Sequence, residues 1–82
     1  MFNEEEIQVL KKVGENIRLL RIERDLSQFD LASEAGIPKN QIGRIERAEI
    51  NTTILTLHKI ANALKVDTTL LLGINSLNNE SL

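Results

Sequence analysis

The side chains best suited to chemistry lie in residues 27–47, where long polar donors recur at helical spacing. Gly36 and Pro38 divide this stretch into two short helices, because glycine accepts the left-handed backbone that ends a helix and proline sets φ for the next. Ile42 and Ile45, three residues apart, give the second helix an apolar face. Its outer face then carries side chains that can contact phosphates or base edges: Lys39, Asn40, Gln41, Arg44 and Arg47.

The preceding helix is predicted from its cap and its apolar spacing. Ser27 is a good N-cap, and Leu31, Ala32 and Ala35 fall on one face of a helix that begins at Gln28. Two short helices joined by a tight turn, with polar donors on the second, are what a DNA recognition unit needs. The alternative is an ordinary pair of helices in a small bundle that binds no DNA.

The order of these features resembles the helix-turn-helix of the Cro/C1-type (XRE) family of bacterial and phage transcriptional regulators, over roughly residues 13–74. Residues 42–47 are close to the usual end of that family's recognition helix. The resemblance implies an all-α, five-helix, lambda-repressor-like DNA-binding domain with helix 38–46 in the major groove of double-stranded DNA. Seven positions have the kind of residue that the family pattern requires: Gln28, Leu31, Ala32, Gly36, Ile37, Ile42 and Ile45.

The position of each donor on helix 38–46 suggests its role on DNA. Lys39 and Asn40 lie at the start of the helix that faces the groove, and Arg44 lies one turn further on, so we expect these three to read bases. Lysine and arginine suit guanine O6 and N7, and asparagine suits adenine N6 and N7. Each of these residues can equally be a solvated surface residue. Phosphate contacts are expected from Gln28, which resembles the family's phosphate-binding glutamine, and from Gln41, Arg47 and Thr53.

The resemblance also implies structural roles. Arg21 and Glu46 resemble a pair that in this family joins the first helix to the end of the recognition helix, and we expect a partly buried, bidentate contact between them. Gly36 is expected to hold the turn between the two short helices. Ala48 stands where the family commonly has glycine, so the shape of the loop that follows the recognition helix stays open.

The first helix is expected from about residue 4 to residue 24, with Asn3 as its cap. Gly14 weakens its middle, so we expect one bent or continuous helix that joins an N-terminal extension, 1–12, to the family-like core. Its predicted inner stripe consists of Ile7, Leu10, Val13, Ile17 and Leu20.

Two more helices are predicted after the recognition helix. Thr52 or Thr53 caps the fourth, and a short fifth helix over residues 68–72 follows Asp67 and ends before Gly73. Residues 75–82 are expected to form a frayed tail. The predicted inner face of the fourth helix consists of Ile54, Leu57, Ile60, Ala61 and Leu64.

The charge of the chain is low for a DNA-binding protein, with a formal net charge of -2 at pH 7. The bases are unevenly placed, because residues 1–10 hold three acids and no base while residues 11–47 hold eight bases against six acids. The excess of positive charge therefore falls in the segment assigned to DNA. Since that excess is small, we expect marked salt sensitivity and weak non-specific binding.

The composition excludes several other classes of function. A chain of 82 residues suits one domain, and the absence of cysteine fits a reducing cytoplasm. No apolar run approaches the ~20 residues of a membrane span, so we expect a soluble cytoplasmic protein. The single histidine, His58, cannot assemble a metal site or a catalytic set, and we expect no catalytic residue, no metal and no cofactor. Without tyrosine or tryptophan, RNA and single-stranded DNA are poorer ligands than duplex DNA.

An excess of apolar residues near the C-terminus predicts a homodimer. A helix in a small bundle turns only part of its circumference inward, so some side chains in the crowded segment after residue 69 must face outward. Two recognition helices related by a dyad would read an inverted repeat with half-sites about 10 base pairs apart. Within the family the chain resembles a controller protein or a phage repressor, and an antitoxin or protein-interaction module is the alternative. The expected dimer contacts are Ile50, Leu70, Leu71 and Ile74.

Overall fold

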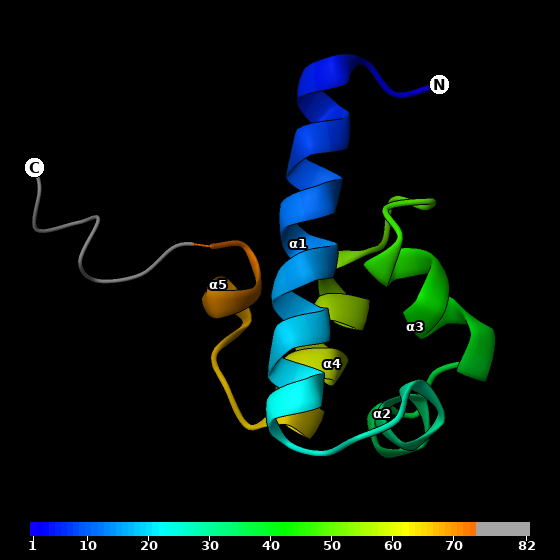
Figure 1. The fold of residues 1–82 in the computed structure, drawn as a ribbon, viewed down its shortest axis with the longest axis vertical. Coiled ribbons are helices and arrows are strands. Elements are labelled where there is room, and N and C mark those ends of the chain that lie inside the picture. The colour runs from blue at the N-terminus through cyan, green and yellow to red at the C-terminus, as the bar shows by residue number, and fades with distance from the viewer. Residues whose placement is uncertain (74–82) are drawn as a thin grey trace, which may run out of the picture.

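The computed structural model describes residues 1–73 and contains five helices in that range (Figure 1). The helix α4 crosses behind α1 and packs against α1, α2 and α5, while α2 and α3 lie together on one side of α1. The all-α, five-helix fold predicted from the sequence is confirmed. The helices are α1, Glu4–Glu23; α2, Gln28–Ala35; α3, Lys39–Glu46; α4, Ile54–Leu64; and α5, Thr68–Leu71.

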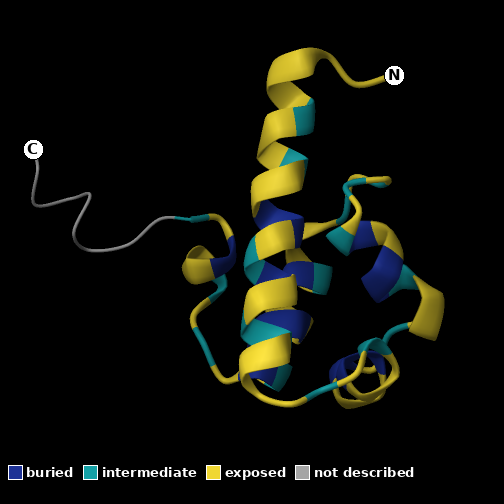
Figure 2. Ribbon diagram, viewed as in Figure 1, coloured by how far each residue is buried: buried dark blue, intermediate teal, exposed yellow. Residues whose placement is uncertain are grey.

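One buried apolar cluster joins all five helices, and Figure 2 shows the buried segments of the ribbon facing one another across it. Leu71 belongs to this cluster with 0% of its surface exposed, so its assignment to a dimer interface was wrong. A short helix must turn at least one large side chain into the core to be held there, and α5 uses Leu71. The largest fully buried side chains are Ile17, Leu31, Ile42, Ile60, Leu64 and Leu71.

The helix α1 is continuous through Gly14, and its first turns extend past the core (Figures 1 and 2). It starts with a capping box, in which the Asn3 side chain accepts from the Glu6 N–H at 2.8 Å and the Asn3 N–H donates to the Glu6 carboxylate at 2.9 Å. Because these first turns lie outside the core, Ile7 and Leu10 are only half-buried, and the predicted stripe is fully buried only further along the helix.

The reason for glycine at position 14 is close packing. An ideal Cβ placed on Gly14 would lie 2.5 Å from the carbonyl oxygen of Ile45 and 2.7 Å from that of Glu46. These oxygens belong to the last turn of α3, so the missing side chain lets the backbones of α1 and α3 approach each other. The sequence suggested only that this glycine weakens α1, and its role in seating α3 was missed.

The α4 segment departs from the prediction at its start. Thr53 is the N-cap and accepts from the Thr56 N–H at 3.0 Å. Ile54, predicted to face inward, is 78% exposed, and its neighbour Leu55 is 71% exposed. The first two residues of α4 therefore lie beyond the edge of the core, whereas Leu57 of the same turn is buried. The spacing of Ile54 from the inner residues could not reveal this.

Four helices end with the same left-handed turn. In each, the N–H of the residue after the positive-φ residue donates to a carbonyl five residues back, which is the pattern of a Schellman motif. Ala48 adopts φ 60°, so the alanine accepts the left-handed stop, at a strain of about 1–2 kcal/mol for a residue with a Cβ. The residues with positive φ at the ends of α1, α2, α3 and α4 are Asp25, Gly36, Ala48 and Lys65.

We predict that Gly14→Ala destabilises the fold, although alanine favours a helix over glycine by about 1 kcal/mol. The new methyl group would meet backbone atoms of α3, which cannot rotate away, and overpacking of this kind costs about 1–3 kcal/mol. The thermal midpoint from circular dichroism should fall. Gln8→Ala, at an exposed position of the same helix, should leave it almost unchanged. A higher midpoint for Gly14→Ala would show that α1 and α3 are not closely packed there.

Candidate nucleic-acid interface

The pair of helices α2 and α3 is fixed locally at its start and at its turn. Ser27 caps α2 by accepting from the Asp30 N–H at 2.9 Å. Gly36 has φ 73°, and the N–H of Ile37 donates to the carbonyl of Ala32 at 3.1 Å. The turn thus has the left-handed geometry that the glycine indicated. The helix α3 follows it and lies beside α2 at the outside of the molecule (Figure 1).

The end of α3 is held to α1 by a partly buried ion pair. Arg21 Nε donates to Glu46 Oε2 at 2.7 Å, and Arg21 Nη2 donates to Glu46 Oε1 at 3.1 Å. The two side chains are 13% and 4% exposed, so water screens the pair poorly. The hydrogen bond from Glu46 stabilises the guanidinium and raises the pKa of Arg21 further above its ordinary value, although burial acts in the opposite direction. The expected bidentate contact is present.

Gln28 donates a further hydrogen bond to the same carboxylate. Its amide nitrogen donates to Glu46 Oε1 at 3.0 Å, which ties the first residue of α2 to the last residue of α3. Arg21 also donates from Nη1 to the carbonyl of Leu26, at 2.9 Å, in the loop between α1 and α2. One carboxylate therefore receives donors from α1 and α2 and fixes the end of α3. The phosphate contact expected of Gln28 stays a prediction. In this structure the amide nitrogen of Gln28 donates to Glu46 instead.

The outer face of α3 carries the polar residues predicted for it. Lys39, Asn40 and Arg44 are exposed and Gln41 is half-buried, while the apolar side of the helix lies in the core. The Lys39 ammonium lies 5.9 Å from the ring centroid of Phe29 on α2, which is a cation–π distance. The structure therefore brings the three expected base-readers together on one solvent-facing helix side.

The last turn of α3 holds an arrangement that sequence reasoning missed. Arg47 Nε donates to Glu49 Oε2 at 2.7 Å, and Arg44 Nε lies 3.9 Å from Glu49 Oε1. The hydrogen bond from Arg47 lowers the pKa of the Glu49 carboxyl below its ordinary value. A Cβ placed on Gly43 would lie 2.9 Å from Arg47 Nη1 and 3.1 Å from Gln28 Oε1, so the glycine leaves room for both side chains. Residues two apart do not face each other on a helix, so the spacing of Arg47 and Glu49 did not indicate this contact.

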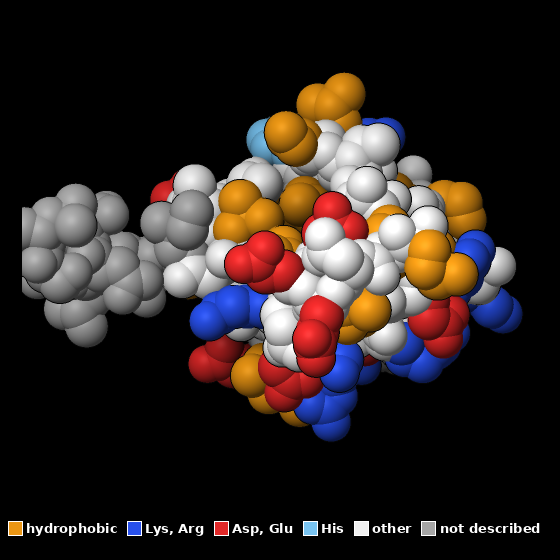
Figure 3. Space-filling model, turned by 90° about the horizontal axis from the view of Figure 1, so that it is seen from above, with side chains coloured by type: hydrophobic (Ala, Val, Ile, Leu, Met, Phe, Trp, Pro, Cys, Tyr) orange, Lys and Arg blue, Asp and Glu red, His pale blue; other side chains and the backbone are white. Residues whose placement is uncertain are grey.

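Acidic side chains gather at the opposite end of α1 from the ion pair. Figure 3 looks down on the N-terminal end of α1, where acidic side chains cluster with exposed apolar ones beside them. The first turn of α1 contains Glu4, Glu5 and Glu6. At 1.5 Å per residue, this turn lies about 25 Å along the helix from Arg21. Its negative charge is therefore more than a Debye length, about 8–10 Å in physiological salt, from the end of α3 that Arg21 holds.

Comparison with known proteins places this geometry in a family. The sequence model described as "Helix-turn-helix" matches residues 17–71, which includes α2, α3 and α4. The chain belongs to this helix-turn-helix family. Its members, of the Cro/C1 or XRE type, are DNA-binding transcription regulators and not enzymes. The family predicted from the sequence is confirmed.

Relatives of the helix-turn-helix chain include regulators of two kinds. It is 40% identical to the control protein C.SmaI of Serratia marcescens over 68 residues, 83% of this chain and 81% of the relative. It is 34% identical over 68 residues to the immunity repressor of Bacillus phage phi105, and covers 47% of that longer protein. The structure of the restriction-modification controller C.AhdI from Aeromonas hydrophila matches with a TM-score of 0.74 at 34% identity, over 76% of this chain and 94% of that one.

Membrane insertion is not indicated by the helices. Within residues 1–73, no helix combines the length and the apolar character that crossing a bilayer requires.

We predict that Glu46→Ala lowers the free energy of unfolding by about 3–5 kcal/mol, because it leaves the Arg21 charge buried without its partner. Urea denaturation measures this directly. Glu23→Ala is the matched control, since Glu23 also pairs with an arginine, at 3.2 Å, but its side chain is 73% exposed. Equal stability of the two variants would show that the Arg21–Glu46 pair does not hold α3 in place.

Proposed function

We propose that this protein is a sequence-specific transcription regulator that binds an inverted repeat in double-stranded DNA as a homodimer, with α3 in the major groove. It acts in the cytoplasm as a controller-type or phage-type regulator. The observation that carries the proposal is the outer face of α3, where Lys39, Asn40 and Arg44 are exposed on a helix whose orientation is fixed by buried contacts. A recognition helix needs both features, because base edges are read only from a fixed position in the groove.

Phosphate contacts are proposed around the edges of this face. Gln28 and Gln41 lie near the starts of α2 and α3, where unpaired backbone N–H groups attract anions. Thr53 and Arg47 flank the loop after α3. Thr53 uses its hydroxyl to cap α4 and to bond with the Thr56 hydroxyl at 3.0 Å, so its phosphate contact would have to share that oxygen.

The proposed dimer rests on apolar surface beside α5. Ile50, half-buried in the loop after α3, and Leu72, 41% exposed after α5, line one hollow of about 120 Å³ together with Val9 and Leu10 of α1. Leu70 is also exposed, at 39%. Residue 74, the remaining contact predicted from the sequence, lies outside the described residues. A second copy related by a dyad would cover this surface and double the number of base contacts.

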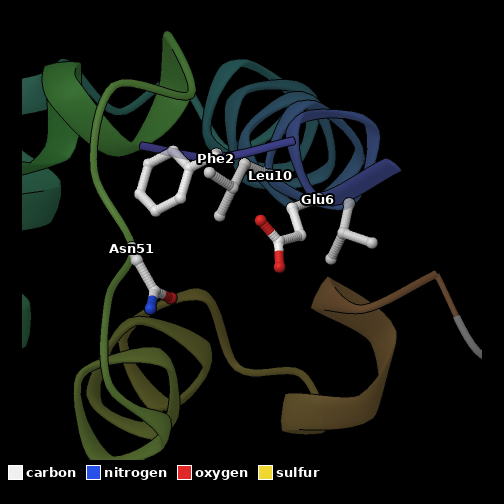
Figure 4. A pocket seen from close by; sticks show the side chains of 5 residues that line it. Phe2, Glu6, Leu10 and Asn51 are labelled. Atoms are coloured by element: carbon white, nitrogen blue, oxygen red, sulfur yellow. The ribbon is translucent and has the colours of Figure 1, made fainter. Parts of the chain in front are cut away.

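The proposed surface continues along the N-terminal extension. Figure 4 shows Phe2, Glu6 and Leu10 on the α1 side and Asn51 on the opposite loop, all facing one groove. The groove joins the hollow beside α5, because Leu10 and Asn51 line both. The N-terminal extension is therefore positioned to contribute to the dimer contact.

A protein-interaction module is the second candidate. Ile54 and Leu55 are exposed at 78% and 71% on consecutive positions of α4, and contiguous apolar surface of this kind marks contacts with other proteins. In that case DNA binding would be secondary. Selection of binding sites from random duplex DNA separates the two candidates, because an enriched inverted repeat supports the regulator and no enrichment supports the interaction module.

We predict that Arg44→Ala weakens binding to the selected operator by about 1–3 kcal/mol and reduces its preference over scrambled DNA, because one base contact is lost. Fluorescence anisotropy with both duplexes measures the two affinities. The thermal midpoint should stay unchanged, since Arg44 is exposed. Gln41→Ala, a proposed phosphate contact, should weaken both duplexes alike and keep the preference. If the arginine variant keeps full preference for the operator, Arg44 is not a base-reader.

We predict that Leu72→Glu dissociates the homodimer at micromolar concentrations, because a carboxylate would be buried in an apolar contact without a partner. Sedimentation equilibrium gives the mass. Leu19→Glu, an equal change at a leucine of α1 that is 52% exposed, should leave the dimer intact. A wild-type protein that is monomeric at tens of micromolar would rule out the dimer and the inverted repeat that depends on it.

A further inference from the structure

The loop after α3 places an acid where the other helix ends place an apolar side chain. The residue that follows the left-handed position closes each Schellman motif, and an apolar contact usually accompanies it. At the end of α3 this residue is Glu49, whose N–H donates to the Arg44 carbonyl at 2.9 Å. At the ends of α1, α2 and α4 the equivalent residues are apolar and pack against the core: Leu26, Ile37 and Val66.

The position of Glu49 brings its carboxylate to the guanidinium groups of the binding face. Its oxygens lie 2.7 Å and 3.5 Å from Arg47 Nε and Nη2, and 3.9 Å from Arg44 Nε. A carboxylate that receives two donors of one arginine presents the same planar pair of oxygens as a phosphate. The Arg47 side chain is thereby turned back toward Gly43, with Nη1 2.9 Å from the position where a Cβ would stand.

We propose that Glu49 is an internal competitor for DNA phosphate, which occupies Arg47 in the free protein and must be displaced when DNA binds. The proposal rests on the proposed DNA-binding function and adds a residue that sets its affinity. Because the competition concerns phosphates, it weakens binding to every duplex by the same factor. Glu49 therefore limits non-specific binding without taking part in base recognition.

Exchange of the acid for its amide tests this inference. Glu49→Gln keeps the shape of the side chain and removes its charge. Affinity for operator and scrambled duplexes should both rise about two- to fivefold per recognition helix, the range expected for release of an exposed ion pair. The ratio of the two affinities should stay constant. The slope of log K against log salt should become steeper by about 0.9 per recognition helix, as for one further phosphate neutralised by each copy of Arg47.

Two controls separate this effect from a general change of charge. Glu15→Gln makes the same change in net charge at an exposed acid of α1, which lies 3.7 Å from Arg18, and should not change affinity or salt slope. Arg47→Ala combined with Glu49→Gln should bind as Arg47→Ala alone, because the hydrogen bonds that Glu49 makes are to Arg47, and Arg44 Nε is a more distant neighbour at 3.9 Å.

The outcomes distinguish failure of the competition by Glu49 from failure of the proposed DNA binding. If Glu49→Gln binds no more tightly than wild type, or if Glu15→Gln gains as much, the competitor is overturned while DNA binding stands. If the gain persists without Arg47, the proposed partner is wrong and so is the competition. If neither wild type nor Glu49→Gln binds any selected duplex, the DNA-binding function itself fails.

Discussion

The Glu46 carboxylate is the point at which three helices are fixed relative to one another. It belongs to the end of α3 and accepts hydrogen bonds from Arg21 of α1 and Gln28 of α2. Apolar packing alone has little directional preference, so it would allow α3 to rotate or slide on the core. Charged hydrogen bonds have defined directions, and burial makes them costly to break. The exposed polar side of α3, which we propose contacts DNA, is therefore positioned by a contact made at the end of the helix.

Much of this arrangement was predictable because it depends on local rules. Gly36 ended α2 with a left-handed turn, and the spacing of Ile42 and Ile45 identified which side of α3 is buried. Capping at Asn3 fixed the start of α1. The contact between Arg21 and Glu46 lies 25 residues apart in the chain and was predicted only through the family resemblance. Local patterns identify helices, whereas the distances between them require knowledge of the fold.

Most of the features that were missed depend on packing between distant segments. Gly14 was interpreted by helix propensity, although its role is to admit the backbone of α3. Ile54 was assigned to the inner face of α4 by its spacing and Leu71 to the outer surface by the crowding of apolar residues, but the depth of the core decided that Ile54 is exposed and Leu71 buried. Glu49 had no helical partner to indicate its position, because a left-handed turn at Ala48 directs it back to Arg44 and Arg47. The spacing of residues along the chain does not determine how deep a side chain lies in the core or how closely two helices pack.

The helix α3, the proposed recognition helix, is only eight residues long. A helix of this length is unstable by itself in water, since isolated helices shorter than about 12–15 residues are marginal. It exists because the rest of the domain holds it, so folding of the domain and formation of the binding surface are one event. An operator that binds only the folded form then acts as a stabilising ligand for the entire domain, by an amount that grows with the logarithm of its concentration. Occupied regulator would consequently resist unfolding and proteolysis longer than free regulator, which links the lifetime of the protein to the state of the gene it binds.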